Sequence, residues 1–221
     1  MKSLMRTMAA LGLTAGMALA AASTAHASVV SYTFNGVNGD LGNSVVVSAG
    51  LTVTAYRSTP SSGWTSSGVT VARNTNAIGV DRGTDSNPGQ IDSNLGLVEG
   101  LLFDFGTDLF STAQLTLSQY AAADRLDLWV GSSFVASNLA NPLANQVFAN
   151  AGPANPFTVQ LNYNRFLFIA AAADPSSTAN SCSTGVNCFR VDNLMAVPEP
   201  ASLALVGAAM LAAGAARRRK S

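Results

Sequence analysis

The chain has 221 residues and a formal net charge of zero, but its charges are unevenly distributed. Between residues 28 and 197, six arginines stand against eleven carboxylates, a net charge of −5, and neither histidine nor lysine occurs there. This composition excludes histidine-based nucleophilic catalysis, an imidazole zinc site and a lysine Schiff base in that segment, and its acidity argues against nucleic acid as a partner.

The first 27 residues have the features of a secretory signal peptide. Lys2 and Arg6 precede an apolar stretch over 8–22, and Ala25 and Ala27 supply the small residues of a cleavage site. An N-terminal membrane anchor is the alternative, but the apolar run is short and is followed by Ala-x-Ala. We therefore expect export, with cleavage after Ala27.

The body of the chain, residues 28–197, alternates apolar and polar residues with a period of two, which is typical of half-buried β-strands. The clearest alternations cover 51–56, 125–130 and 157–163, and further strands are expected at 29–34, 69–73, 100–105, 113–117, 166–170 and 189–194. Turn residues separate these runs, and no amphipathic helix is expected.

Short antiparallel strands over a single domain's length favour two sheets packed face to face. The expected fold is all-β, a jelly-roll-like β-sandwich. The side chains expected to face its core are Leu126, Leu128, Val130, Phe157, Val159 and Leu161.

Two tryptophans are candidate glycan contacts. Trp129 alternates onto the face opposite the core residues of its strand, and Trp64 lies in a segment rich in Ser, Thr and Gly. An exposed indole ring offers a flat apolar face to a sugar. The alternative is that a neighbouring loop covers each ring.

Carboxylates supply the remaining candidate sites. Asp81, Asp85 and Asp92 lie in a Gly/Asn/Ser-rich segment and are candidate Ca²⁺ ligands, although their spacing differs from that of an EF-hand and a solvated acidic turn is the alternative. Glu99, the one glutamate between residues 28 and 197, is a candidate general acid or a structural ion-pair partner of an arginine.

Cys182 and Cys188 are expected to form a disulfide, because an even pair in an oxidising compartment is most simply a structural bridge. A redox or metal role is the alternative. The spacing is not Cys-x-x-Cys, and no other cysteine or histidine of the body completes a metal shell.

The C-terminal segment, residues 198–221, has three parts. Pro198, Glu199 and Pro200 come first, and the prolines are expected to keep the chain extended and outside any helix or sheet. The apolar stretch 201–216 is just long enough for a transmembrane helix. The last part is a basic cluster of Arg217, Arg218, Arg219 and Lys220, which is expected to stay on the cytoplasmic side.

These three parts resemble the PEP-CTERM sorting signal of bacterial surface proteins. The resemblance implies processing by an exosortase, a membrane-embedded enzyme similar to cysteine transpeptidases, which recognises the tripeptide, cuts nearby and releases or re-attaches the exported protein. A plain tail anchor, in which the prolines are incidental, is the alternative. With a signal peptide at the other end, the resemblance implies a Gram-negative-type cell.

The expected function is that of an exported surface or extracellular-matrix protein with a structural or adhesive, non-enzymatic role and no cofactor. Its expected partners are an exosortase and, transiently, the inner membrane. The first alternative is a carbohydrate-binding module that recognises exopolysaccharide through Trp64 or Trp129. The second is a glycosidase or lyase that uses carboxylates alone, which the lack of histidine does not exclude.

Overall fold

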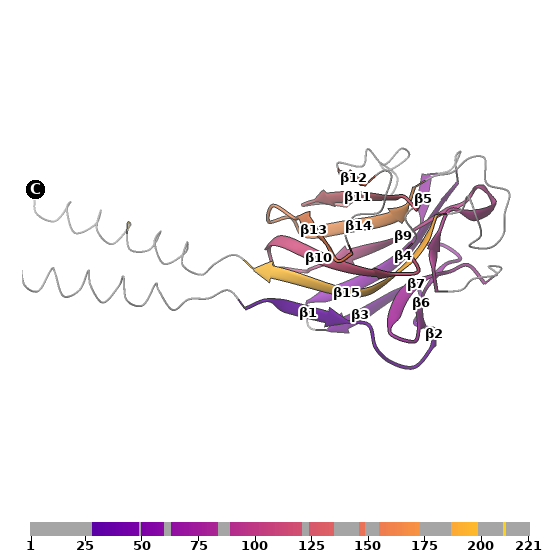
Figure 1. Cartoon of the computed structure of the whole chain (residues 1–221), viewed down its shortest axis with the longest axis horizontal. Coiled ribbons are helices and arrows are strands. Elements are labelled where there is room, and N and C mark those ends of the chain that lie inside the picture. The colour runs from indigo at the N-terminus through magenta and orange to yellow at the C-terminus, as the bar shows by residue number, and fades with distance from the viewer. Residues whose placement is uncertain are drawn as a thin grey trace, which may run out of the picture. The chain divides into compact units, whose positions relative to one another are not determined.

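The computed structural model describes residues 28–48, 50–59, 63–83, 89–120, 124–134, 146–148, 155–172, 187–198 and Met210, and the structural statements below concern these residues. Residues 29–197 form one compact unit. Its strands form two antiparallel sheets, so the predicted all-β, two-sheet architecture is confirmed (Figure 1).

The first sheet is centred on its longest strand, β15. Its strand order is β13, β10, β15, β7, β6, β2, and β1 and β8 also pair with β15. The strands are β1 (Val30–Thr33), β2 (Gly39–Asp40), β6 (Thr70–Asn74), β7 (Ala77–Asp81), β8 (Ile91–Asp92), β10 (Phe110–Ser118), β13 (Phe157–Gln160) and β15 (Cys188–Pro198).

The second sheet has the order β12, β11, β14, β9, β4, β3, and β5 also pairs with β4. Its strands are β3 (Ser44–Ser48), β4 (Leu51–Thr59), β5 (Gly63–Thr65), β9 (Val98–Asp104), β11 (Leu126–Gly131), β12 (Gln146–Phe148) and β14 (Phe166–Ala171). A single 3₁₀ turn in the described part of the chain, η1 (Asn94–Gly96), separates β8 from β9.

Alternating side chains of both sheets meet in one apolar core. Leu126, Leu128 and Val130 of β11 are at most 8% exposed and belong to this core. Phe157, Val159 and Leu161, from β13 and the residue after it, are at most 5% exposed and belong to it too. Both sets were predicted to face the core, and the structure confirms this. Burying each such side chain contributes about 1.5–3 kcal/mol, which makes this core the main source of stability.

Some strands were not predicted, because their sequences lack a regular alternation of apolar and polar residues. These strands are β2, β3, β5, β7, β8 and β12. Four consecutive residues of β7, Ala77 to Val80, are buried, so the strand shows no polar face. One predicted strand is too long, because β13 ends at Gln160. Asn162 and Tyr163 have φ angles of 50° and 62°, a turn conformation that ends the extended run.

Candidate functional site

Strand β15 carries the chain directly into the predicted sorting signal. Ala196 is fully buried and pairs with Val30 of β1, and the Val197 carbonyl oxygen accepts a hydrogen bond from Ser111 Oγ at 3.2 Å. Pro198 is the last residue of the strand. The expected extended backbone is therefore present at Pro198, but the expectation that this proline lies outside the sheet is wrong. Its missing N–H is tolerated because the pairing with β1 ends two residues earlier, at Ala196.

Many predicted site residues lie outside the described residues, so their predictions stay untested by the structure. These are Ala25, Ala27, Asp85, Cys182, Glu199, Pro200, Arg217, Arg218, Arg219 and Lys220, together with the stretch 201–216 apart from Met210. In the described part of the chain, no helix combines the length and the apolar character needed to cross a bilayer.

A buried ionic cluster, made of Arg82, Asp92, Asn94 and Glu99, joins β7, β8, η1 and β9. Arg82 Nε lies 2.5 Å from Glu99 Oε1, and Arg82 Nη2 lies 3.7 Å from Asp92 Oδ1. Arg82 also donates to the Asn94 side-chain oxygen. Asn94 donates from Nδ2 to Asp92 Oδ2 at 2.8 Å, and the backbone N–H of Asp92 donates to Glu99 Oε2 at 3.2 Å. The arginine thus lies between two carboxylates in the protein interior.

The burial of this cluster favours a structural role for Glu99. The Glu99 side chain is 0% exposed and contacts Arg82. A general acid has to come within hydrogen-bond reach of the bond it protonates. Because a buried charge costs several kcal/mol unless it is paired, the Arg82 contact explains why a carboxylate is tolerated there.

Two of the three calcium candidates, Asp81 and Asp92, lie in the described residues, and each contacts a different group. Asp81 Oδ1 accepts a hydrogen bond from the Gly83 backbone N–H at 2.6 Å, which closes a local turn. Asp92 is fully buried and faces Arg82 instead. Within the described ranges, no group of three or more His, Cys, Asp or Glu side chains is arranged to hold a metal ion. A calcium site shared by Asp81 and Asp92 is therefore not supported.

Asn187, just before β15, ties together the loops beside the ionic cluster. Its side-chain oxygen accepts from the Arg125 N–H, and its Nδ2 donates to the Ala172 carbonyl, both at 2.8 Å. The next residue, Cys188, is 4% exposed and is not a free thiol. Its pairing with Cys182 stays a prediction, because Cys182 lies outside the described residues.

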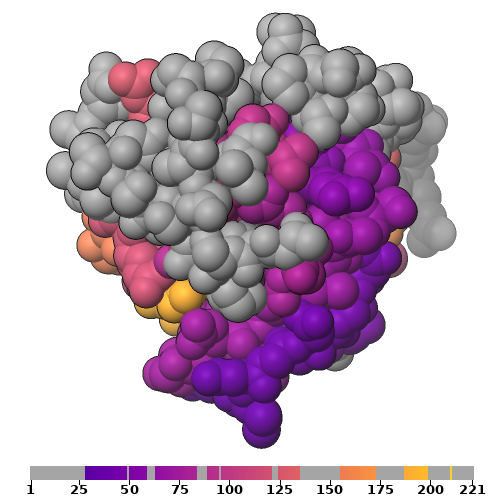
Figure 2. Space-filling model, turned by 90° about the vertical axis from the view of Figure 1, so that its right-hand side faces the viewer, coloured from indigo at the N-terminus to yellow at the C-terminus, as the bar shows by residue number. Residues whose placement is uncertain are grey.

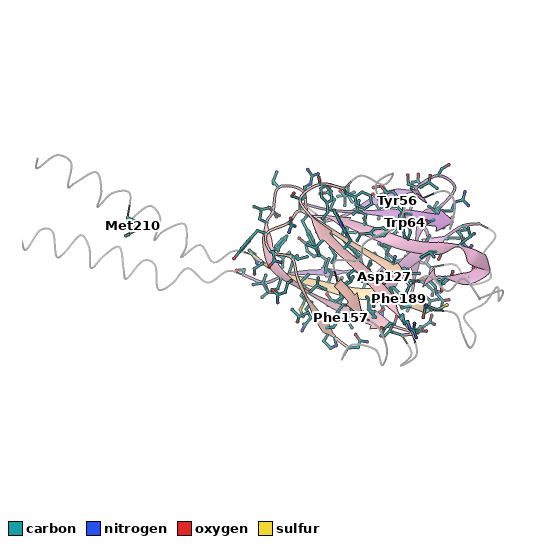
Figure 3. All side chains as sticks on the ribbon, turned by 90° about the horizontal axis from the view of Figure 1, so that it is seen from above. Tyr56, Trp64, Asp127, Phe157, Phe189 and Met210 are labelled. Atoms are coloured by element: carbon teal, nitrogen blue, oxygen red, sulfur yellow. The ribbon has the colours of Figure 1, made fainter. Side chains whose placement is uncertain are left out.

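The outer face of the second sheet carries an aromatic cluster, whose members are Tyr56, Trp64, Trp129, Phe134, Phe166 and Phe168. Phe168 of β14 lies at its centre, 4.7 Å from Trp64 and 6.0 Å from Tyr56 between ring centroids, in edge-to-face contacts. Figure 3 labels Tyr56 and Trp64, which come from the adjacent strands β4 and β5. Gly100 makes room for this packing, since a Cβ there would lie 2.5 Å from Phe168 Cζ.

The two tryptophans differ in what they offer to a ligand. Trp64 is 5% exposed, so it presents no free ring face, and the glycan-contact prediction does not hold for this residue. Trp129 is half-buried on the outer face, as its alternation predicts. Its ring lies over Gly131, where a Cβ would come within 2.3 Å of it, and contacts Phe134 edge to face.

Polar groups accompany the aromatic cluster. Asp127, two residues before Trp129 on the same face, is half-buried, and burial raises the pKa of its carboxyl group. Burial likewise raises the pKa of the Tyr56 hydroxyl. Arg165 lies 4.8 Å from the Phe166 ring centroid and forms an exposed ion pair with Asp104, whose pKa it lowers.

A polar pocket of about 360 Å³ lies over β2, β6 and β7. Its lining includes Asp40, Arg73 and Asp81, and Asp40 accepts a hydrogen bond from the Thr70 hydroxyl at 3.0 Å. Figure 2 shows the end of the molecule where the N-terminal strands, in indigo to magenta, reach the surface. The charged lining residues include both signs, and we assign no ligand to this pocket.

Sequence reasoning missed the partner of Glu99 and most of the aromatic cluster. Nothing in the local pattern around Arg82 distinguishes it from an exposed arginine. Phe134 follows β11 outside any strand, and Phe168 lies in a strand with five buried residues in a row, so neither shows an alternation. The outward position of Trp129, which follows from the alternation of its strand, was the feature of the sequence that indicated an aromatic surface.

One comparison with known proteins bears on this chain. Residues 196–220 match the family model of the PEP-CTERM protein-sorting motif. No curated protein matches the sequence significantly. The match begins at Ala196, inside β15, and ends at the last residue of the basic cluster.

Proposed function

We propose that this chain, which carries a PEP-CTERM protein-sorting motif at residues 196–220, is a structural or adhesive surface protein of a Gram-negative-type bacterium. The motif implies export across the membrane to the cell surface and processing by an exosortase. It is the one observation that carries the proposal.

In this proposal the stretch 201–216 holds the exported protein briefly in the inner membrane, with the cations 217–220 on the cytoplasmic side. The signal peptide, residues 1–27, starts the export and is removed. The body then reaches the cell surface or the extracellular matrix after the exosortase has acted at the tripeptide.

A non-enzymatic role agrees with the chemistry of the body. Histidine and lysine are lacking from residues 28–197, which leaves carboxylates as the main groups for acid–base work. Glu99 and Asp92 lie inside the buried ionic cluster against Arg82. We propose that the sandwich acts through its stable folded surface rather than through a reaction.

Replacing both prolines of the tripeptide tests the sorting proposal. The double variant Pro198→Ala, Pro200→Ala keeps the apolar stretch and the cations but removes the fixed backbone that marks the motif. We expect it to accumulate untrimmed in the membrane fraction, whereas the same change at two body prolines, Pro142→Ala, Pro153→Ala, leaves trimming intact. Finding the double variant trimmed and exposed at the cell surface would contradict the proposal.

A second candidate function is recognition of exopolysaccharide by the aromatic cluster. The observation that favours it is the half-buried Trp129 ring on the outer sheet face, with the Asp127 carboxyl on the same strand and face. An aromatic ring next to a hydrogen-bonding group is a combination that binds sugars. In this version Trp129 is the glycan contact and Trp64 supports the packing beneath.

Binding of the host's exopolysaccharide, measured by pull-down, tests this candidate. We expect Trp129→Ala to weaken saturable binding at least tenfold, because a stacked ring contributes on the order of 1.4 kcal/mol or more. Tyr163→Ala is the matched control, since Tyr163 is an exposed aromatic residue outside the cluster. Equal binding by both variants would remove this candidate.

A further inference from the structure

The second sheet ends in a strand whose outer edge has no partner in the described part of the chain. This strand, β3, pairs with β4 on its other side (Figure 1). Its sequence is Ser-Val-Val-Val-Ser, with neither a charge nor a proline. The chain has no charged residue over the whole stretch 41–56. Unpaired backbone N–H and C=O groups along such an edge are a template for pairing with another chain.

The three other strands that end the strand order of a sheet are shorter than β3, and short edge strands resist such pairing. Strand β2 has two residues, one of which is Asp40, β12 has three and β13 has four. Strand β3 has five residues and one irregularity, a register shift between Val46 and Ser48. A bulge bends its strand locally, and this one lies at the end of β3 that leads into β4. The rest of the β3 edge has none of the usual protecting features.

The side chains of β3 alternate between the core and the solvent. Val45 and Val47 are partly buried and pack against the main core, whereas Val46 is 70% exposed. On the outer face, the hydroxyl of Thr54 on β4 donates to Ser44 Oγ at 3.0 Å. The inward valines therefore hold β3 in the sheet, and Val46 is left as an apolar side chain in water.

The sequence of β3 reads the same in both directions, which suits an antiparallel pair of identical strands. About a two-fold axis at Val46, Ser44 of one copy faces Ser48 of the other, and Val46 faces its own counterpart. We propose that two copies of this chain pair edge to edge through β3, so that the second sheet runs continuously through a dimer. The lack of charge supports this partner, because like charges directly opposite each other would destabilise a strand pair.

Such a dimer has a consequence for the outer face of the second sheet. Because both copies use the same edge, the contact closes as a dimer and does not extend into a fibre. Tyr56 lies two residues after Thr54 on β4, so the aromatic cluster occupies the same face as Val46. The dimer therefore presents two aromatic clusters on one face, where a polymer that contacts both is held more firmly than by one. This consequence rests on the second candidate function, whereas the pairing itself does not.

A cysteine at the two-fold axis tests the pairing in the full chain, produced in its native cells. We expect Val46→Cys to form a disulfide-linked dimer, because residues directly opposite in an antiparallel pair have Cβ atoms about 4.5–5.5 Å apart, close to the spacing that a disulfide spans. Val37→Cys is the matched control, since Val37 is 86% exposed and lies outside any strand. Cys182 and Cys188 are present in both variants, so exchange with them affects both alike.

Non-reducing electrophoresis separates the outcomes. We expect Val46→Cys to migrate at twice the mass of the monomer and Val37→Cys to migrate as the monomer. Equal linking by both variants would show random collision and overturn the proposal. A Val46→Cys chain that stays monomeric, or that links to a different protein, would overturn it as well.

A charge at the axis supplies a second test that needs no disulfide. Val46→Lys brings two ammonium groups together in the dimer, and we expect it to raise the dissociation constant about fivefold or more. Val37→Lys adds the same charge away from β3 and leaves the constant unchanged. Sedimentation velocity of the full chain in detergent measures both variants. Equal effects of the two substitutions, or a parent chain that is monomeric at every concentration, would contradict pairing through β3.

Discussion

Arg82 illustrates how a single buried charge organises its surroundings. Its guanidinium lies between Glu99 and Asp92 and also donates to Asn94, so one side chain joins the ends of β7 and β8 to η1 and β9. Two carboxylates in the interior need such a cation, because each alone carries a desolvation penalty of several kcal/mol. The cluster therefore fixes a local arrangement that apolar packing alone would not specify.

Replacement of this arginine gives a direct prediction. Arg82→Met keeps much of the apolar stem but removes the cation between Asp92 and Glu99, and we expect it to lower the free energy of unfolding by about 3–5 kcal/mol. Arg165→Met is the control, because its ion pair with Asp104 is exposed and such pairs contribute about 0–1 kcal/mol. Urea denaturation at neutral pH measures both, and equal losses would contradict the structural role of the cluster.

At the level of single residues, the sequence predicted which side chains of an alternating strand face the core and which face outward. The inward Leu126, Leu128 and Val130 and the outward Trp129 follow from a period of two. The pairing of Arg82 with Glu99 joins residues 17 positions apart through a turn of the fold, so no local pattern reports it. The burial of Trp64 depends on Phe168, which is more than a hundred residues away in the sequence.

At the level of strands, the predictions succeed where one face is buried and the other is not. The strands β4, β10 and β11 alternate in this way, and their positions were predicted. The prediction for β15 was too short, because its segment was expected to end at Leu194, whereas the strand continues to Pro198. Pro198 was expected to lie outside any sheet, but a proline can occupy the end of a strand, where no N–H is needed for the ladder.

This extension of β15 carries the first sheet up to the sorting motif. A strand that ended at Leu194 would leave an unpaired spacer before the tripeptide. The actual strand pairs with β1 as far as Ala196 and leaves Pro198 at its tip. Strand β15 therefore reaches the first residue of the predicted tripeptide.

For the whole molecule, targeting signals could be predicted more fully than the role of the body. The tripeptide, the apolar stretch and the basic cluster are contiguous in sequence, and the family model matches them at residues 196–220. The surface chemistry of the sandwich is assembled from distant strands, as in the aromatic cluster. Its ligand therefore depends on geometry that no single segment encodes.

We propose that the C-terminal segment is a temporary tether. The intact mass of the protein isolated from the cell surface or matrix tests this proposal. We predict a mass that lacks both residues 1–27 and the basic cluster, while the membrane-held precursor retains Arg217 to Lys220. Surface molecules that still carry those four cations would show that the C-terminal segment is a permanent anchor.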